Sequence, residues 1–148
     1  MICGVDEAGR GPVLGPMVVA AVAIEDDAPL RHMQVRDSKK LTPARRDELA
    51  AKITETCRVE FRVISHEEID ARGTKTSLNE LEAVVFAFLI DRLKADVVYV
   101  DACEVNEDHF RQMVSGRLSR RMTFTKPPGS ILTSSHQILP GLGPHVPK

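Results

Sequence analysis

Hydrophobic and polar residues follow two periods along the chain, and each period predicts a different kind of element. Apolar runs and alternating apolar residues predict strands. In one of these segments Val59, Phe61 and Val63 alternate with charged residues, which indicates a half-buried strand at or near a sheet edge. The four predicted strands are Met1–Val5, Met17–Ile24, Arg58–Ile64 and Asp96–Asp101. A Gly/Pro-rich turn joins the first two closely enough for antiparallel pairing.

Capping residues and helical spacing predict the helices. Thr42 and Pro43 supply an N-cap and a first-position proline for a helix that runs to Ile53. Ser77 and Glu80 form a capping box at the start of the longest helix. Its predicted apolar face comprises Leu78, Leu81, Val84, Val85, Phe88, Leu89 and Leu93. A short helix is predicted over 105–114.

Two of the predicted strands end in carboxylates. Asp6 and Glu7 follow the first strand, and Asp101 ends the last one. If these two strands are parallel neighbours, Asp6 and Asp101 emerge side by side, and such oxygen ligands suit Mg²⁺ or Mn²⁺. An isolated aspartate after a strand is more often a turn or helix-cap residue, so the spacing alone leaves both interpretations open.

Composition sets limits on the class of protein. A chain of 148 residues with 43% hydrophobic and 28% charged residues fits one globular domain. The formal net charge of −1 gives no overall attraction to nucleic acid, so binding to a polyanion would need local Lys/Arg clusters or metal ions. Three widely spaced cysteines without a CxxC pair, and no secretory signal, predict reduced thiols in a cytoplasmic protein. The longest apolar stretch, 13–24, is too short to span a membrane.

The C-terminal segment differs from the rest. Five Pro and three Gly fall among the last 22 residues, where Lys148 is the only formally charged side chain. Such a segment does not continue the pattern of helices and strands. We therefore expect one folded domain over residues 1–119 and a divergent, poorly ordered tail over 120–148.

Three motifs resemble those of one enzyme family. The run Met1–Pro16, with Asp-Glu-Ala-Gly-Arg-Gly at its centre, resembles the signature of type 2 ribonucleases H (ribonuclease HII). Asp37–Thr42 and Tyr99–Ala102 match that family in order and spacing, and Asn79–Glu82 and Val100–Cys103 look closer to its archaeal branch. The resemblance extends from Met1 to about Ser119.

The resemblance implies a fold and an activity. The fold is ribonuclease H-like α/β, a mixed five-stranded sheet flanked by helices, with the last strand and the C-terminal helices incomplete or altered in this chain. The activity is two-metal hydrolysis of the RNA strand of RNA:DNA hybrids, including ribonucleotides embedded in DNA, with 5′-phosphate and 3′-hydroxyl products. Such an enzyme would act as a monomer in DNA replication and repair.

The resemblance also assigns site residues. The metal-binding carboxylates would be Asp6, Glu7 and Asp101. The loop that senses the 2′-hydroxyl of a ribonucleotide would be Gly9, Arg10 and Gly11, and the phosphate contacts would come from Lys39 and Lys40. Outside this context, a Gly-Arg-Gly triplet is more often a tight turn, and a lysine pair is more often solvated surface.

The chain departs from the family after the short helix. The family carries a fourth metal-binding aspartate there, in a Lys-Ala-Asp-Asp-x-Tyr segment, whereas Leu118–Lys126 of this chain contains no acid and none follows Asp108. We therefore expect impaired catalysis, because a two-metal site that lacks a ligand holds its second ion weakly. The alternatives are a catalytically inactive remnant that binds hybrids and a fragment without function.

A frameshift near Ser119 would explain the departure. Read two nucleotides later, the codons of Met122 and Thr123 give GAC, an Asp codon, and those of Phe124 and Thr125 give a Tyr or His codon. Permitted codons for Ser119 and the two following arginines complete Lys-Ala-Asp. We predict that the coding nucleotides spell this segment in the shifted frame, and codons that cannot do so would exclude the explanation.

Overall fold

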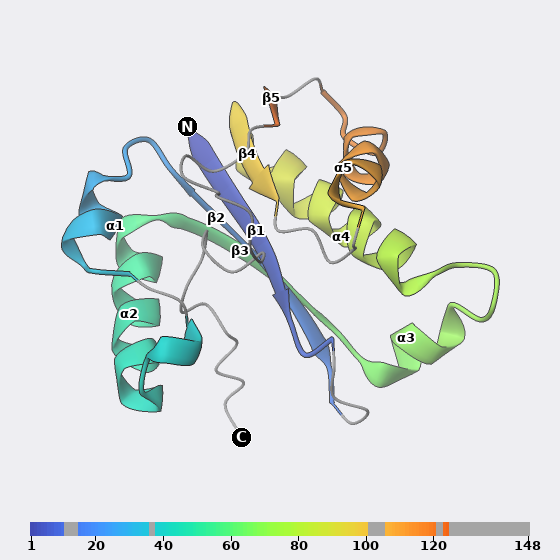
Figure 1. The fold of residues 1–148 in the computed structure, drawn as a ribbon, viewed down its shortest axis with the longest axis horizontal. Helices are drawn as coiled ribbons and strands as arrows, with labels where there is room; N and C mark the ends of the chain where they lie inside the picture. Colours follow the sequence, from blue (N-terminus) through green and yellow to red (C-terminus); the bar gives the residue numbers. More distant parts are fainter. Residues whose placement is uncertain (11–14, 36–37, 101–105, 121–122, 125–148) are drawn as a thin grey trace.

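A mixed sheet organises the chain. The computed structural model describes residues 1–10, 15–35, 38–100, 106–120 and 123–124. They include a five-stranded sheet of order β3-β2-β1-β4-β5 (Figure 1). The strands are β1 (Ile2–Ala8), β2 (Met17–Ile24), β3 (Arg58–Ile64), β4 (Val97–Val100) and β5 (Thr123–Phe124). The predicted mixed five-stranded α/β fold is confirmed, and β5 is a stub of two residues.

The central strand, β1, has one antiparallel and one parallel neighbour. It pairs antiparallel with β2 and parallel with β4. The parallel register places Val5 opposite Val100, so Asp6 directly follows the last described pair. The condition stated from the sequence, that the first and last predicted strands are parallel neighbours, is therefore met. Asp101 itself lies outside the described residues.

Helices cover both faces of the sheet. Helices α1 and α2 lie on one side, and α3, α4 and α5 lie on the other (Figure 1). The helices are α1 (Ala28–His32), α2 (Pro43–Thr56), α3 (His66–Ala71), α4 (Leu78–Leu93) and α5 (Glu107–Ser115), with a 3₁₀ turn η1 at Ser38–Lys40. Within the described part of the chain, no helix combines the length and apolarity needed to cross a bilayer.

Helix α4 forms the main core with the sheet. Phe86, Leu89 and Ile90 of α4 pack in one cluster with Cys3 and Val5 of β1, and all five are at most 1% exposed. The ring of Phe86 also meets Phe110 of α5 edge to face, with centroids 5.4 Å apart. The predicted capping box of Ser77 and Glu80 is present at the start of α4.

Four apolar side chains predicted to be buried are exposed instead. On α4, Val84 and Phe88 are 49% and 50% exposed, because the helix meets the sheet through the neighbouring stripe of its surface. On β3, Phe61 and Val63 are 66% and 44% exposed. That strand lies at the sheet edge, as predicted, and only one of its faces is closely covered by α4. The predicted burial was wrong at these four positions.

Candidate active site

Asp6 and Glu7 lie near the end of the central strand. They are opposite Ala20 and Val19 of β2, and both side chains are partly buried. Successive residues of a strand face opposite sides, so Glu7 points to the α4 side, as Val5 does, and Asp6 points to the other. The backbone N–H of Glu7 donates to Oδ1 of Asp6 at 2.8 Å. The strand therefore presents two adjacent carboxylates on a rigid backbone.

The environment of Asp6 disfavours its charged form. Burial raises the pKa of Asp6 to about 7, and the charge of Glu7 acts in the same direction. The backbone hydrogen bond from Glu7 and the positive charge of Lys39 oppose this rise in pKa. A bound cation would lower this pKa again and favour the ionised carboxylate, so binding of a metal ion and ionisation of Asp6 would support each other.

The lysine pair lies on a turn that α2 anchors. Lys39 and Lys40 are exposed in η1, which ends two residues before Thr42, the N-cap of α2. Arg46 of α2 donates to the carbonyl of Ser38, the residue directly before Lys39, at 3.5 Å. Upstream, Arg45 donates to the carbonyl of Met33 at 3.1 Å. The first turn of α2 thus holds the segment that brings Lys39 within electrostatic reach of Asp6.

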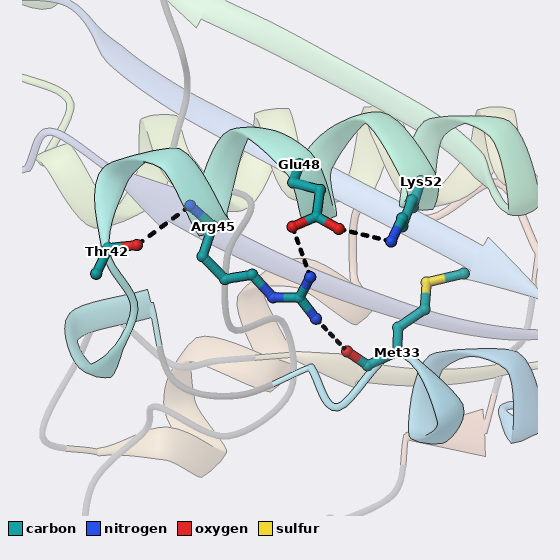
Figure 2. A network of polar contacts seen from close by, with 5 residues as sticks. All are labelled: Met33, Thr42, Arg45, Glu48 and Lys52. Carbon is teal, nitrogen blue, oxygen red and sulfur yellow. Dashed lines mark hydrogen bonds and ion pairs between the residues drawn. The ribbon is translucent and has the colours of Figure 1, made fainter.

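A network on α2 fixes the orientation of Arg45 (Figure 2). Glu48 accepts from Arg45 and from Lys52, each at 2.6 Å, and the two cations lower the pKa of Glu48 to about 2. The N-cap Thr42 accepts from the backbone N–H of Arg45 at 3.3 Å. These exposed contacts direct the guanidinium toward Met33, as Figure 2 shows.

The loop after β1 makes two close contacts. Gly9 has φ +86°, and a Cβ at that position would lie 2.5 Å from the carbonyl oxygen of Pro16, so glycine is required there. Arg10 reaches α4, where Nη2 donates to Oδ1 of Asn79 and Nε lies 3.1 Å from Oε1 of Glu82. Glu82 is 0% exposed. The backbone packing of Gly9 and the side chain of Arg10 therefore tie this loop to two different parts of the fold.

The described structure tests the arrangement of the expected site residues only in part. Glu7 and Lys39 each lie within electrostatic reach of Asp6, and Gly9 and Arg10 follow just downstream in the chain. Asp101 and Gly11 lie outside the described residues. Among those that are described, no three His, Cys, Asp or Glu side chains are gathered closely enough to hold a metal ion. The roles of all eight site residues stay predictions.

Sequence reasoning missed the side-chain roles of Asn79 and Glu82. The missed signal was a charged residue at position 82, on the helical stripe that also carries Leu78, Leu81 and Val85. A carboxylate on such a stripe is buried and needs a partner, because burial of an unpaired charge is costly. The partner, Arg10, is 72 positions away in sequence, and local patterns carry no information about such a pair.

The fold and the site define a mixed α/β protein with a carboxylate pair near the end of its central strand. The chain belongs to the Ribonuclease HII family, whose sequence model matches residues 3–128. It is 44% identical over 119 residues to Ribonuclease HII of Methanoregula boonei, covering 80% of this chain and 56% of that protein. The corresponding protein of Archaeoglobus fulgidus is 43% identical over 122 residues, covering 82% and 56%.

Solved structures show the same relationship. The Ribonuclease HII in the PCNA:RNase HII complex from Archaeoglobus fulgidus superposes with a TM-score of 0.78 at 38% identity, covering 86% of this chain and 62% of that one. Ribonuclease H2 from Pyrococcus horikoshii gives a TM-score of 0.75 at 35% identity, covering 83% and 60%. Bst-RNase HIII, at 22% identity and a TM-score of 0.67, shares the fold. The chain spans little more than half the length of the curated relatives it matches.

The raised pKa of Asp6 predicts how stability depends on pH. The folded-state pKa of about 7 exceeds the ordinary value of 3.8, so between these values the folded chain binds more protons than the unfolded chain. The free energy of unfolding therefore falls as pH rises through this window. We expect Asp6→Asn, which removes the charge, to melt at least ~3 °C above the unmodified chain at pH 8 without divalent cations.

The comparison with pH 4 is the internal control for this prediction. Both forms are uncharged at position 6 in the folded state near pH 4, so the difference in melting temperature should shrink toward zero there. Asp70→Asn, at an exposed position, should show no such dependence on pH. An equal difference between Asp6→Asn and the unmodified chain at both pH values would contradict the raised pKa.

Proposed function

We propose that this chain carries the catalytic region of a metal-dependent endonuclease that cleaves the RNA strand of RNA:DNA hybrids. Ribonucleotides embedded in DNA are included, and the products carry 5′-phosphate and 3′-hydroxyl ends. One observation carries the proposal: the partly buried, adjacent carboxylates of Asp6 and Glu7 near the end of the central strand, with Lys39 within electrostatic reach of Asp6. Membership of the Ribonuclease HII family supports it independently.

The chemistry of the donors fits a hard divalent cation. Asp6 and Glu7 offer carboxylate oxygens, and Asp101 would supply a third, a set that suits Mg²⁺ or Mn²⁺ better than a thiophilic metal. When bound, such ions activate water and stabilise the charge of the transition state in phosphodiester hydrolysis. Asp6 and Glu7 would hold the ions on a backbone that pairs with β2, directly after the residues of β1 that also pair with β4.

Other residues would bind the substrate. Lys39 and Lys40 present two exposed positive charges, which suit the phosphates of the nucleic-acid backbone because an ammonium group attracts phosphate without reading a base. Gly9, Arg10 and Gly11 would bring backbone amides close to the ribose and sense its 2′-hydroxyl. The required glycine at position 9 supports a loop built for close backbone approach.

We propose that catalysis is impaired, because Leu118–Lys126 contains no acid at the place where the family motif carries a fourth metal-binding aspartate. The same observation favours a second candidate function, the binding of hybrids without turnover. We also propose that the chain consists of a domain over 1–119 and a tail over 120–148. We propose further that it is a monomer and that it is located in the cytoplasm.

Cleavage of a duplex with one embedded ribonucleotide tests the function. With Mg²⁺ or Mn²⁺ we expect weak cleavage, at least ~100-fold slower than by the full-length Methanoregula boonei relative, since the loss of one ligand weakens charge stabilisation by the metal. Asp6→Asn should abolish the remaining cleavage, and an all-DNA duplex should stay intact.

The other outcomes separate the candidates. Binding of the hybrid without cleavage would support the second candidate function. Cleavage at the rate of the full-length relative would contradict the proposed impairment. If the chain neither cleaves nor binds the hybrid, both proposals are overturned and the chain is a fragment without function.

The lysine pair gives a separate binding test. The double variant Lys39→Ala/Lys40→Ala should weaken binding to hybrid and all-DNA duplexes alike, because phosphate contacts are independent of sequence and sugar. The slope of log affinity against log salt should become shallower by about 1 for each phosphate that a lysine no longer neutralises. The matched control is Lys94→Gln, at the far end of α4, and equal effects of the two changes would exclude a specific role for the pair.

A further inference from the structure

The contact between Arg10 and Glu82 is the least expected feature of the core. Glu82 is the fifth residue of α4, where the helix packs on the sheet, and its side chain is completely buried. It is the only charged or polar residue among the fully buried side chains of the described chain. Nε of Arg10 lies 3.1 Å from its carboxylate, while the Arg10 side chain itself keeps 29% of its surface exposed. A charge of the core is thus paired with a residue of a surface loop.

Stability alone does not account for this pair. Removing two charges from water costs about as much as their attraction returns, and well-packed apolar residues often serve as well or better. The best-attested use of a buried polar contact is to select one geometry among several. Here the geometry selected is that of the loop, because α4 is already held to the sheet by its apolar side chains.

The surrounding contacts restrict the same short stretch of backbone. One residue before Arg10, Gly9 adopts φ +86° against the carbonyl of Pro16. Asn79, one turn before Glu82 on α4, accepts a second hydrogen bond from the Arg10 guanidinium. The guanidinium is therefore held by two side chains of one helix, and a planar group held at two points has a defined orientation.

We propose that Glu82, assisted by Asn79, is a positioning residue that fixes the backbone at Gly9 and Arg10 for recognition of the ribonucleotide. The recognition step rests on the proposed function, whereas the anchoring of the loop does not. Because Glu82 balances the charge of Arg10, this arginine serves as an anchor, and attraction of phosphate is left to the lysines of η1. Glu82 contacts no substrate and acts through Arg10.

The anchor is tested first by proteolysis. Glu82→Gln keeps the shape of the side chain but removes the charge that holds Arg10. We expect the initial rate of tryptic cleavage after Arg10, followed by mass spectrometry and normalised to cleavage after Arg31, to rise at least 10-fold. Glu82→Asp, which keeps the charge, should restore most of the protection.

A matched control separates anchoring from stability of the helix. Glu80→Ala removes the capping-box carboxylate from the same turn of α4 without touching Arg10. It should lower the melting temperature and leave cleavage after Arg10 unchanged. Equal cleavage in Glu82→Gln and the unmodified chain, or an equal increase in Glu80→Ala, would overturn the proposal.

Binding then tests the use of the anchor. Affinities are measured without divalent cations for a duplex with one ribonucleotide and for the same duplex in DNA alone. In Glu82→Gln the ratio of the two affinities should fall at least 5-fold. The affinity for the DNA duplex should not fall, because the phosphate contacts of the lysines are unchanged and the Arg10 charge is no longer balanced by Glu82. A structural role alone would lower both affinities together and would overturn the proposed role in recognition.

The two measurements also distinguish this proposal from the proposed function. If the unmodified chain binds both duplexes equally, the proposed function fails for this chain and the recognition role of Glu82 fails with it. The proteolysis comparison still decides whether Glu82 anchors the loop. Retained preference for the ribonucleotide in Glu82→Gln, with faster cleavage after Arg10, would refute the recognition role and leave the proposed function standing.

Discussion

The pairing of β1 with strands on both sides is the constraint on which the rest of the structure depends. Hydrogen bonds to β2 and β4 fix the backbone of β1, and the alternation of its side chains sends Val5 into the core and Asp6 to the opposite face. The chain then leaves the sheet within a few residues, at Gly9 and Arg10. The acidic pair and the loop share one rigid origin, so a shift of β1 would displace both together.

Local sequence patterns were sufficient for most of the elements. The bounds of β2 and β3 match the apolar run and the alternation, and the capping box at Ser77 correctly marks the start of α4. These features depend on neighbours within a few residues, which a sequence displays directly. The parallel pairing of β1 with β4 was stated from the sequence only as the condition for Asp6 and Asp101 to emerge side by side, and the structure fulfils that condition.

Features that depend on distant contacts could not be predicted in the same way. Helical spacing identified a broad apolar surface on α4, but it could not show which stripe meets the sheet, so Val84 and Phe88 were assigned to the core although they are half exposed. The proximity of Lys39 to Asp6 depends on how α2 holds the preceding segment. The carboxylates of Asp6 and Glu7 were singled out by their place at the end of a predicted strand, and their metal-binding assignment came from a family motif.

The ion pair of Arg10 and Glu82 has a consequence for how such sequences can change over time. Losing Arg10 removes the ion pair of a completely buried carboxylate, at a cost of roughly 3–5 kcal/mol when a buried pair is broken, which is a large part of the stability of a small domain. A single replacement at one of these positions is therefore disfavoured by selection. The two positions should vary together across homologues, although 72 residues separate them in the chain.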